Sequence, residues 1–309
     1  MTTVNCGLWT KRGFTLLELL VVLVILSFFL AVMPEVFRGY LDQRKFEKTR
    51  KGMQEIKKAL FGSTPYYSIS KRKVAGYIVD MGGLPPLDAS TGQPKALWTN
   101  DLNGDGEPDL PDWRPLSSEI DPYCTWYGKG RTIFIGWRGP YIEEPTDGVL
   151  RDGWGNPLVF SVVNGDMTIR SYGADGIEGG LGYDKDIALT IRQREYMAAI
   201  AGQVDFENTF ADNIRVRIYY PLNGVETKKT IVGVNADGYF RFESVSGESD
   251  GRGRANVNIP IGMRPVIAWI EDEPADDPEK DNPSFEEKQE MILFYARPTG
   301  NWVGVLNLK

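Results

Sequence analysis

The chain contains no histidine, and this absence limits the chemistry that its side chains can perform. Catalysis by Ser-His-Asp or Cys-His groups, histidine-ligated zinc and histidine pH switches are all excluded. Carboxylates are abundant, because 42 Asp and Glu face 35 Lys and Arg and give a formal net charge of −7. An acidic chain without a large basic block is a poor nucleic-acid binder, so we expect no nucleic-acid partner. The chemistry that stays open is that of carboxylates and of metals bound by oxygen.

The densest group of oxygen ligands lies in the segment Asn100–Trp113, with the sequence NDLNGDGEPDLPDW. Counted from its second residue, positions 1, 3, 5, 9 and 12 carry carboxylate or amide side chains: Asp101, Asn103, Asp105, Asp109 and Asp112. Gly106 occupies position 6, where an EF-hand-type loop needs a sharp turn, and position 7 offers the Glu107 carbonyl. Pro108 and Pro111 oppose an exit helix, so no complete EF-hand is expected. The spacing predicts a calcium loop, and the alternative is a solvated turn.

A second segment rich in glycine and acid lies at Thr168–Ile187, with the sequence TIRSYGADGIEGGLGYDKDI. Its five glycines allow the backbone to curl inward, so that carboxylates and carbonyls can face one point. Oxygen ligands of these kinds suit Ca²⁺. The residue types alone leave two interpretations open, a calcium loop or an ordinary acidic loop.

The element that must position everything else is the N-terminal segment Lys11–Pro34, KRGFTLLELLVVLVILSFFLAVMP. Within it, Phe14–Met33 is twenty residues long, carries the single charge of Glu18 and contains neither glycine nor proline. A helix of that length spans about 30 Å, which is enough to cross the core of a bilayer.

Three interpretations of this segment compete. A secretory signal peptide would have a shorter apolar run and a small-residue cleavage site, and the segment has neither. A plain signal anchor leaves Glu18 unexplained, because a lone carboxylate in a membrane helix costs roughly 3 kcal/mol. The third interpretation comes from the motif itself, since K-R-G-F-T-L-L-E resembles the prepilin signature of type IV pilins and type II secretion pseudopilins.

This resemblance implies specific processing and assembly. A prepilin peptidase would cut after Gly13 and methylate the new amine of Phe14. Glu18 would then be the fifth residue of the mature chain, the position that attracts a neighbouring subunit's N-terminal amine. The physics agrees, because a positive amine and a carboxylate attract strongly when they meet in a low dielectric.

Two features depart from the family pattern. Pro34 would be mature residue 21, whereas family members commonly carry proline at position 22. Basic residues after the apolar helix also outnumber Lys11 and Arg12 before it: Arg38, Arg44, Lys45, Lys48, Arg50 and Lys51. The positive-inside rule alone would favour the opposite orientation, and the motif is given precedence over it.

Beyond Pro34 the helix is expected to continue to about Phe61, where Gly62 and Pro65 stop it. Five apolar residues can share one face of this part: Val36, Tyr40, Met53, Ile56 and Leu60. A rod of about 48 residues, half in lipid and half packed on a head, is the lollipop architecture of the resembled family.

The middle of the chain carries a second resemblance. Arg151–Val162, RDGWGNPLVFSV, and the Thr168–Ile187 segment resemble the head of the major pseudopilin of type II secretion. The similarity covers roughly residues 81–187, and an insertion separates the helix from these motifs. The resemblance implies a calcium loop with carboxylates from Asp175, Asp184 and Asp186. It also implies ligand carbonyls from Tyr172 and Ile177.

The C-terminal third, from about Ala198, shows short alternating strands. Ile214, Val216, Ile218 and Tyr220 alternate with other residues, which predicts a strand with one buried face. Asn223-Gly224 predicts a hairpin turn after that strand. Further strands are expected at Lys228–Val234, Tyr239–Phe242, Ala255–Ile261, Pro265–Ile270, Met291–Ala296 and Trp302–Leu308. Seven such strands indicate an immunoglobulin-like or transthyretin-like β-sandwich, with the acid-rich stretch Glu271–Glu290 as an exposed loop.

Together these features predict an α+β chain. A long N-terminal transmembrane and amphipathic helix leads into a pseudopilin head with a short antiparallel sheet, and an all-β sandwich follows. The expected parts are a leader at 1–13, a transmembrane helix at 14–33, an amphipathic helix at 34–62, a head at 63–193 and a sandwich at 198–309.

The resemblance implies a structural subunit of a periplasmic pseudopilus or pilus-like filament, of type II secretion, with calcium stabilising its head. The chain would cross the bacterial inner membrane once, with the head and sandwich in the periplasm. Its partners would be other pilin or pseudopilin subunits, prepilin peptidase, the inner-membrane assembly platform and secreted cargo. The alternative is a low-copy adhesin or cargo-binding subunit that presents the sandwich. Catalysis is not expected, since the acids cluster in glycine-rich loops and do not face one another across a cleft.

Overall fold

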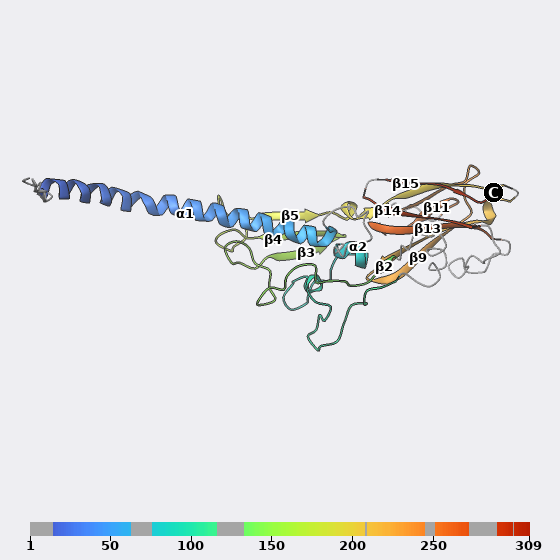
Figure 1. Ribbon diagram of the computed structural model, residues 1–309, viewed down its shortest axis with the longest axis horizontal. Helices are drawn as coiled ribbons and strands as arrows, with labels where there is room; N and C mark the ends of the chain where they lie inside the picture. The colour runs from blue at the N-terminus through green and yellow to red at the C-terminus, as the bar shows by residue number, and fades with distance from the viewer. Residues whose placement is uncertain are drawn as a thin grey trace, which may run out of the picture.

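One long helix, α1 (Leu16–Phe61), projects far beyond the body of the molecule (Figure 1). The computed structural model describes residues 15–62, 76–115, 133–207, 209–244, 251–271, 289–298 and 300–309. The leader 1–13, Phe14 and most of Glu271–Glu290 lie outside the described residues. Figure 1 shows a small sheet beside the second half of α1 and larger sheets at the opposite end of the molecule.

Local signals fix both ends of α1. Thr15 is the N-cap, and its side chain and that of Glu18 form a reciprocal capping box. The helix ends at Gly62, which has a φ of 82°, and this confirms the predicted stop. At 46 residues, α1 is about 69 Å long. Among the described residues, no helix is long and apolar enough to cross a membrane.

The second half of α1 packs on the head. Met53, Ile56 and Leu60 are buried in one core with the short helix α2 (Tyr77–Met81), as their shared face predicts. Tyr40, which was expected on the same face, is 54% exposed. That expectation was wrong because the buried stripe of the helix begins only at Thr49, nine residues further along.

The head is built around a small antiparallel sheet in the order β3–β4–β5, comprising β3 (Val159–Val163), β4 (Asp166–Ser171) and β5 (Ile187–Ile191). The motif Arg151–Val162 therefore leads directly into its first strand. Shorter elements surround the sheet: η1 (Lys95–Leu97), β1 (Arg114–Pro115), β2 (Phe134–Ile135) and η2 (Gln193–Glu195). Phe160, Met167 and Ile169 join the residues from α1 in the head core.

The C-terminal part consists of two four-stranded sheets that share one core. The first has the order β11–β10–β7–β15 and contains β11 (Arg254–Asn256), β10 (Tyr239–Glu243), β7 (Ile200–Asp205) and β15 (Asn301–Asn307). The second has the order β14–β13–β8–β9 and contains β14 (Gln289–Ala296), β13 (Gly262–Ile270), β8 (Ile214–Leu222) and β9 (Val225–Val232). β6 (Met197–Ala198) pairs with β12 (Ile259–Pro260), and η3 (Ala211–Asn213) precedes β8.

Among the predicted features of this part, the hairpin is confirmed and the strands differ in two places. The hairpin turn joins β8 to β9, and both of its residues have positive φ, 52° for Asn223 and 76° for Gly224. The expected strand Ala255–Ile261 is instead split between β11 and β12. β7, which no strand prediction covered, lies between β10 and β15 and pairs in parallel with β15.

β8 does not have the single buried face that its alternating pattern predicted. Ile214, Val216 and Ile218 face the shared core, but Arg217 and Tyr219 on the other face are buried as well. The reason is tertiary: a second cluster covers that face, formed by Ile133, Ile135, Tyr219, Ile267, Trp269 and Met291. The Arg217 guanidinium lies 5.0 Å from the ring centre of Trp269, so a cation–π contact accommodates its charge within the cluster.

The helix and the head meet at a very close backbone approach. Gly153 donates its N–H to Thr49 Oγ1 at 2.8 Å, and a Cβ added at Gly153 would lie 2.0 Å from the Lys45 carbonyl oxygen. Further along α1, Lys57 Nζ lies 2.6 Å from Glu195 Oε2. Only a residue without a side chain allows the loop to lie against the helix at this point.

We predict that Gly153→Ala lowers the free energy of unfolding by about 1–3 kcal/mol, because the added methyl group forces the loop off the helix. The matched control is Gly52→Ala on α1, about one turn beyond Thr49, where a Cβ meets nothing within 4 Å. That change should raise the free energy of unfolding by about 0.5–1 kcal/mol, because alanine favours the helix. Chemical denaturation of both variants checks the pair, and equal effects of the two changes would contradict the close approach.

Candidate functional site

The N-terminal candidate residues are described only in part. Gly13 and Phe14 lie outside the described residues. Glu18 Oε2 accepts hydrogen bonds from the Thr15 N–H at 2.9 Å and from Thr15 Oγ1 at 3.1 Å. In the single chain this carboxylate is therefore satisfied locally at the exposed end of the helix, and Thr15 is a partner that sequence analysis missed.

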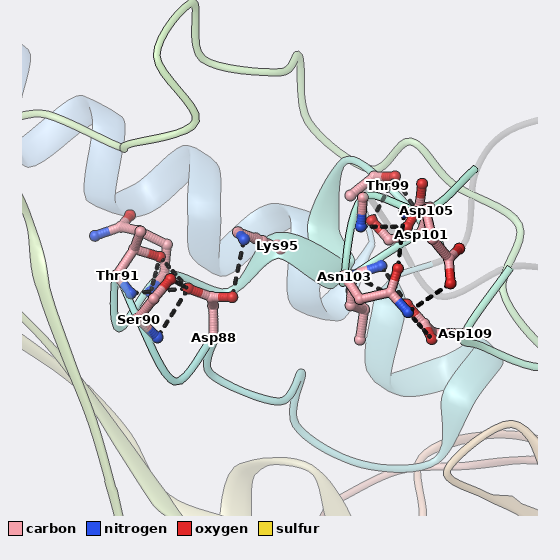
Figure 2. Close-up of polar contacts among 12 residues, drawn as sticks. Asp88, Ser90, Thr91, Lys95, Thr99, Asp101, Asn103, Asp105 and Asp109 are labelled. Carbon is pink, nitrogen blue, oxygen red and sulfur yellow. Dashed lines mark hydrogen bonds and ion pairs between the residues drawn. The ribbon is translucent and has the colours of Figure 1, made fainter. Parts of the chain in front are cut away.

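The acidic loop in the insertion is folded tightly on itself (Figure 2). Asp101 accepts the N–H groups of Gly104 and Gly106 at 2.6 and 2.8 Å. Asn103 Nδ2 donates to Asp105 Oδ2 at 3.0 Å and to Asp109 Oδ1 at 3.3 Å. The structure thus brings together four of the side chains that the spacing predicted.

The two remaining positions of that loop behave differently. Asp112 lies in a β-bridge with Trp137 and has no hydrogen bond with the other four side chains among the described contacts. Glu107 donates its own N–H to Asp105 Oδ1 at 2.8 Å. In the part of the chain that the structure describes, no three His, Cys, Asp or Glu side chains lie close enough to hold a metal ion. Any ion here would need amide and backbone oxygens in addition to carboxylates.

A neighbouring carboxylate closes the turn before this loop (Figure 2). Asp88 Oδ1 accepts hydrogen bonds from the N–H and hydroxyl of Thr91 at 2.8 and 2.7 Å, and from Ser90 Oγ at 2.6 Å. Its Oδ2 lies 2.8 Å from Lys95 Nζ. The hydrogen bond from Lys95 and those from Ser90 and Thr91 lower the pKa of Asp88 far below its ordinary value. Because its oxygens are all engaged, Asp88 holds the turn together.

The glycine-rich segment 172–186 is also closed by its own contacts. Asp175 Oδ1 accepts the Ile177 N–H at 3.0 Å, and Asp186 Oδ1 accepts the Gly179 N–H at 2.9 Å. Arg170 Nη1 lies 3.8 Å from Asp186 Oδ2, so part of its charge is already balanced. Asp184 donates its N–H to the Leu181 carbonyl at 3.1 Å. Tyr172 and Ile177 lie in the same segment, and the Ile177 side chain is 67% exposed.

Asp152 anchors this segment to the rest of the head, and sequence analysis missed it. Asp152 Oδ1 accepts three N–H groups at 2.9 Å, from Trp154, Gly155 and Asn156. Its Oδ2 accepts the buried Ser171 hydroxyl at 2.7 Å. The signal in the sequence was an Asp followed by Gly-Trp-Gly-Asn, which is typical of an Asx turn.

A buried ionisable cluster joins the head to the C-terminal sheets. Asp80 on α2 lies 3.4 Å from Arg138 Nε and accepts the Tyr141 hydroxyl at 3.1 Å. Burial raises the pKa of Asp80 to about 6, while Arg138 and the Tyr141 hydrogen bond act against that rise. Arg264 on β13 is fully buried, and burial lowers its pKa to about 9. Its guanidinium donates to four carbonyls, those of Val79, Pro260, Ile261 and Met263.

This cluster lies at the contact between two parts of the chain. The Gly224 N–H of the β8–β9 turn donates to the Met81 carbonyl at 2.7 Å, directly beside Asp80. A Cβ added at Gly82 would lie 1.8 Å from the Pro221 carbonyl oxygen. α2 is thus fixed to the head through Arg138 and to the C-terminal sheets through Arg264. The arrangement supports a rigid joint, and it holds no nucleophile paired with a base.

Comparison with known proteins gives two matches. Residues 10–34 match the family described as "Prokaryotic N-terminal methylation motif", and residues 130–190 match "Type II secretion system (T2SS), protein G". No curated protein and no solved structure matches the chain. A long helix with a methylation motif at its start, followed by a small head, is similar to the arrangement of pilin-like proteins. The two matched segments confirm the similarity to type II secretion pseudopilins of the G type.

We predict that the stability of the head depends on pH through Asp80. Because its pKa is raised from 3.8 to about 6, the folded chain holds this proton more tightly than the unfolded chain does. The contribution of Asp80 to the free energy of unfolding should therefore fall as pH rises from about 4 to about 6, by at most about 3 kcal/mol, and stay constant above. Asp80→Asn should remove this dependence.

Denaturation of the wild type and the variant across that pH range provides the measurement. Asp88→Asn is the control with the opposite sign. The pKa of Asp88 is lowered on folding, so its stabilisation is present above its ordinary pKa and is lost as pH falls. An identical pH profile for wild type and Asp80→Asn would show that the buried carboxylate does not titrate as described.

Proposed function

We propose that this chain is a structural subunit of a periplasmic type II secretion pseudopilus or a related pilus-like filament. One observation carries the proposal: a G-type head is joined to a helix whose N-terminal half is apolar and exposed. Between Leu16 and Phe28, eleven large hydrophobic side chains are each at least 46% exposed. Monomeric soluble proteins rarely expose an apolar surface of that extent, so lipid or neighbouring helices must cover it.

Processing and assembly follow from the matched methylation motif. In the proposal, prepilin peptidase cuts after Gly13 and methylates Phe14, and Glu18 then attracts the N-terminal amine of a neighbouring subunit. The capping contact between Thr15 and Glu18 supports this proposal, because it provides hydrogen bonds to the Glu18 carboxylate in the free subunit, before a neighbouring amine can bind it. Exchange of that local contact for an amine would favour assembly where water is excluded.

Location and partners complete the proposal. The apolar half of α1 would anchor the chain in the bacterial inner membrane with a single crossing, and the head and C-terminal sheets would lie in the periplasm. The inner-membrane assembly platform would supply subunits to the filament. The function is mechanical, and no catalysis is included in it.

A second candidate function, a low-copy subunit that binds cargo or acts as an adhesin, is favoured by one feature of the C-terminal sheets. Tyr239 on β10 and Trp302 on β15 lie on the outer face of their sheet, with ring centres 5.9 Å apart, and Trp302 is 57% exposed. Exposed aromatic side chains are common in protein-binding surfaces. We propose that these sheets form an immunoglobulin-like or transthyretin-like module, which the two packed four-stranded sheets support.

We also propose that Ca²⁺ stabilises the head. In the insertion loop the ligands would be Asp101, Asn103, Asp105 and Asp109 with the Glu107 carbonyl, and in the glycine-rich segment Asp175, Asp184 and Asp186. The donor set fits calcium, because it consists of oxygen alone. Each carboxylate oxygen of Asp101 and of Asp105 accepts a single N–H group and keeps a lone pair, whereas Asp109 Oδ2 accepts two, from Leu102 and Asn103. A bound cation would remove the repulsion between the loop carboxylates and so stabilise the fold.

The experiment that tests the filament proposal follows processing and assembly together. The full chain is expressed with a prepilin peptidase, its mass is measured, and filaments are sought by electron microscopy. We expect the wild type to lose thirteen residues, gain a methyl group and form filaments. Gly13→Ala should keep its leader and form none, while Gly52→Ala in the helix should behave as the wild type does. Processed Gly13→Ala chains would refute the peptidase step, and processed wild type without filaments would refute the structural role.

Calcium binding is tested by thermal unfolding with calcium or with a chelator. At a calcium concentration one hundred times the Kd, each site should add about 2.7 kcal/mol to the free energy of unfolding. Asp101→Ala and Asp175→Ala should each remove the gain from one loop. Asp237→Ala, in an exposed turn of the C-terminal sheets, is the matched control and should leave the gain intact. Melting curves that coincide with and without calcium would rule out both loops.

A further inference from the structure

A strongly basic stretch of α1 has no role in the function proposed above. Between residues 38 and 51 six basic residues face only two acids, Asp42 and Glu47, although the whole chain has a net charge of −7. Arg38, Arg44 and Lys48 are exposed. This charge lies just after the apolar half of the helix, on the side where the positive-inside rule disfavours it.

The height of these residues along the helix can be estimated from the rise of 1.5 Å per residue. Measured from Met33, where the apolar run ends, Arg38 lies about 8 Å along the axis, Tyr40 about 10 Å and Arg44 about 16 Å. The polar layer of a bilayer is roughly 5–8 Å thick on each side, and surface charge acts over about 8 Å more at physiological salt. All three side chains therefore fall within reach of the headgroups.

Tyr40 and Arg44 form a pair suited to that layer. The Arg44 guanidinium lies 5.0 Å from the ring centre of Tyr40, and the tyrosine is half exposed. Tyrosine is enriched where a membrane meets water, because its ring is apolar and its hydroxyl is polar. Neither side chain is buried against the head: both are exposed, although the head contacts the neighbouring residues Asp42 and Gln43.

The glycine-rich loop places Leu181 two residues from a contact with the same part of α1, and Ile177 lies on the same loop. Leu181 is 87% exposed and Ile177 is 67% exposed. The loop is fixed to α1 by Tyr183, whose hydroxyl donates to Gln43 Oε1 at 3.2 Å and whose ring packs edge-on against Phe46. Figure 1 shows that the part of the head nearest the free half of α1 consists of loops, with β5 further along the helix.

We propose that a collar of residues on α1 and on the glycine-rich loop binds the headgroups of anionic phospholipids in the periplasmic leaflet, before the membrane-anchored subunit enters a filament. The collar comprises Arg38, Tyr40, Arg44, Ile177 and Leu181. The inference rests on the membrane anchor of the proposed function and adds the class of lipid and the residues that meet it.

Lipid explains the whole set better than a second protein surface does. Cations meet phosphates, the tyrosine lies at the interface, and the exposed aliphatic side chains of the loop face the outer part of the headgroup layer. An acidic protein partner would explain the arginines but would leave Ile177 and Leu181 without a role. The collar is also continuous with the apolar surface of α1, which the same membrane would cover.

The test uses the full chain, with Cys6 and Cys124 replaced by serine and a single cysteine placed by Leu181→Cys. An environment-sensitive fluorophore on that cysteine is quenched by lipids that carry a nitroxide near the headgroup. The matched control is Phe210→Cys, an exposed apolar position, 79% exposed, in the C-terminal sheets. Vesicles contain phosphatidylcholine alone, or equal parts of phosphatidylcholine and phosphatidylglycerol.

We expect quenching at position 181 and none at position 210, with stronger quenching in the anionic vesicles. The double variant Arg38→Gln/Arg44→Gln should lose the dependence on phosphatidylglycerol. The control Lys51→Gln/Lys58→Gln removes the same charge from the same helix, but about 27 and 38 Å beyond Met33. This variant should keep the dependence of quenching on phosphatidylglycerol. High salt should weaken the dependence in the wild type.

Each contrary result identifies what fails. Equal signals at 181 and 210 in a chain that floats with the vesicles would overturn the collar and leave the anchor in place. Quenching that ignores lipid charge, or that changes with the ratio of protein to lipid, would overturn anionic-lipid binding, and the latter would indicate contact between copies. A chain that does not float with vesicles would refute the anchor itself and the collar with it.

Discussion

The structure depends on a difference between the two halves of helix α1, because only the second half packs against the head. From Thr49 onward one face of the helix is buried against the head through Met53, Ile56 and Leu60, while the apolar residues from Leu16 to Phe28 remain exposed. Burial of these side chains on the head stabilises the second half by the hydrophobic effect. The first half has the same need, and among the described residues no core cluster includes its apolar side chains from Leu16 to Leu26. A second copy or a membrane must meet that need, so association is built into the fold.

The head can hold the helix rigidly because backbone meets backbone. Gly153 lies against the carbonyl of Lys45, and Asp152 beside it orders three successive N–H groups while it accepts the buried Ser171 hydroxyl. At the other end of the head, Asp80 and Arg264 fix α2 between the head and the C-terminal sheets. A force applied along α1 would therefore pass through packed backbone, the Asp80–Arg138 ion pair and the hydrogen bonds of Arg264 into the C-terminal sheets. That rigidity suits a subunit whose proposed function is mechanical.

Features set by local sequence could be predicted, and features set by distant contacts could not. The end of α1 at Gly62 and the Asn223-Gly224 turn follow from backbone preferences of a few residues, and both are confirmed. Four side chains that the spacing of the insertion loop singled out converge because Gly104 and Gly106 permit tight turns between them. The second buried face of β8 depends on Ile133 and Ile135, about eighty residues earlier, and no pattern within β8 reveals it.

Buried charge was the hardest feature to predict. Asp80 occurs in the five-residue helix YIVDM, where the sequence shows only an acid among apolar residues. Its partners Arg138 and Arg264 are 58 and 184 residues away, so nothing local distinguishes it from a solvated carboxylate. The same reasoning applies to Arg217, which an alternating strand pattern places on a solvent face and the fold buries beside Trp269. In both cases the charge is tolerated because the fold supplies hydrogen bonds or an aromatic face at the site, and removing one partner alone would leave a buried group uncompensated.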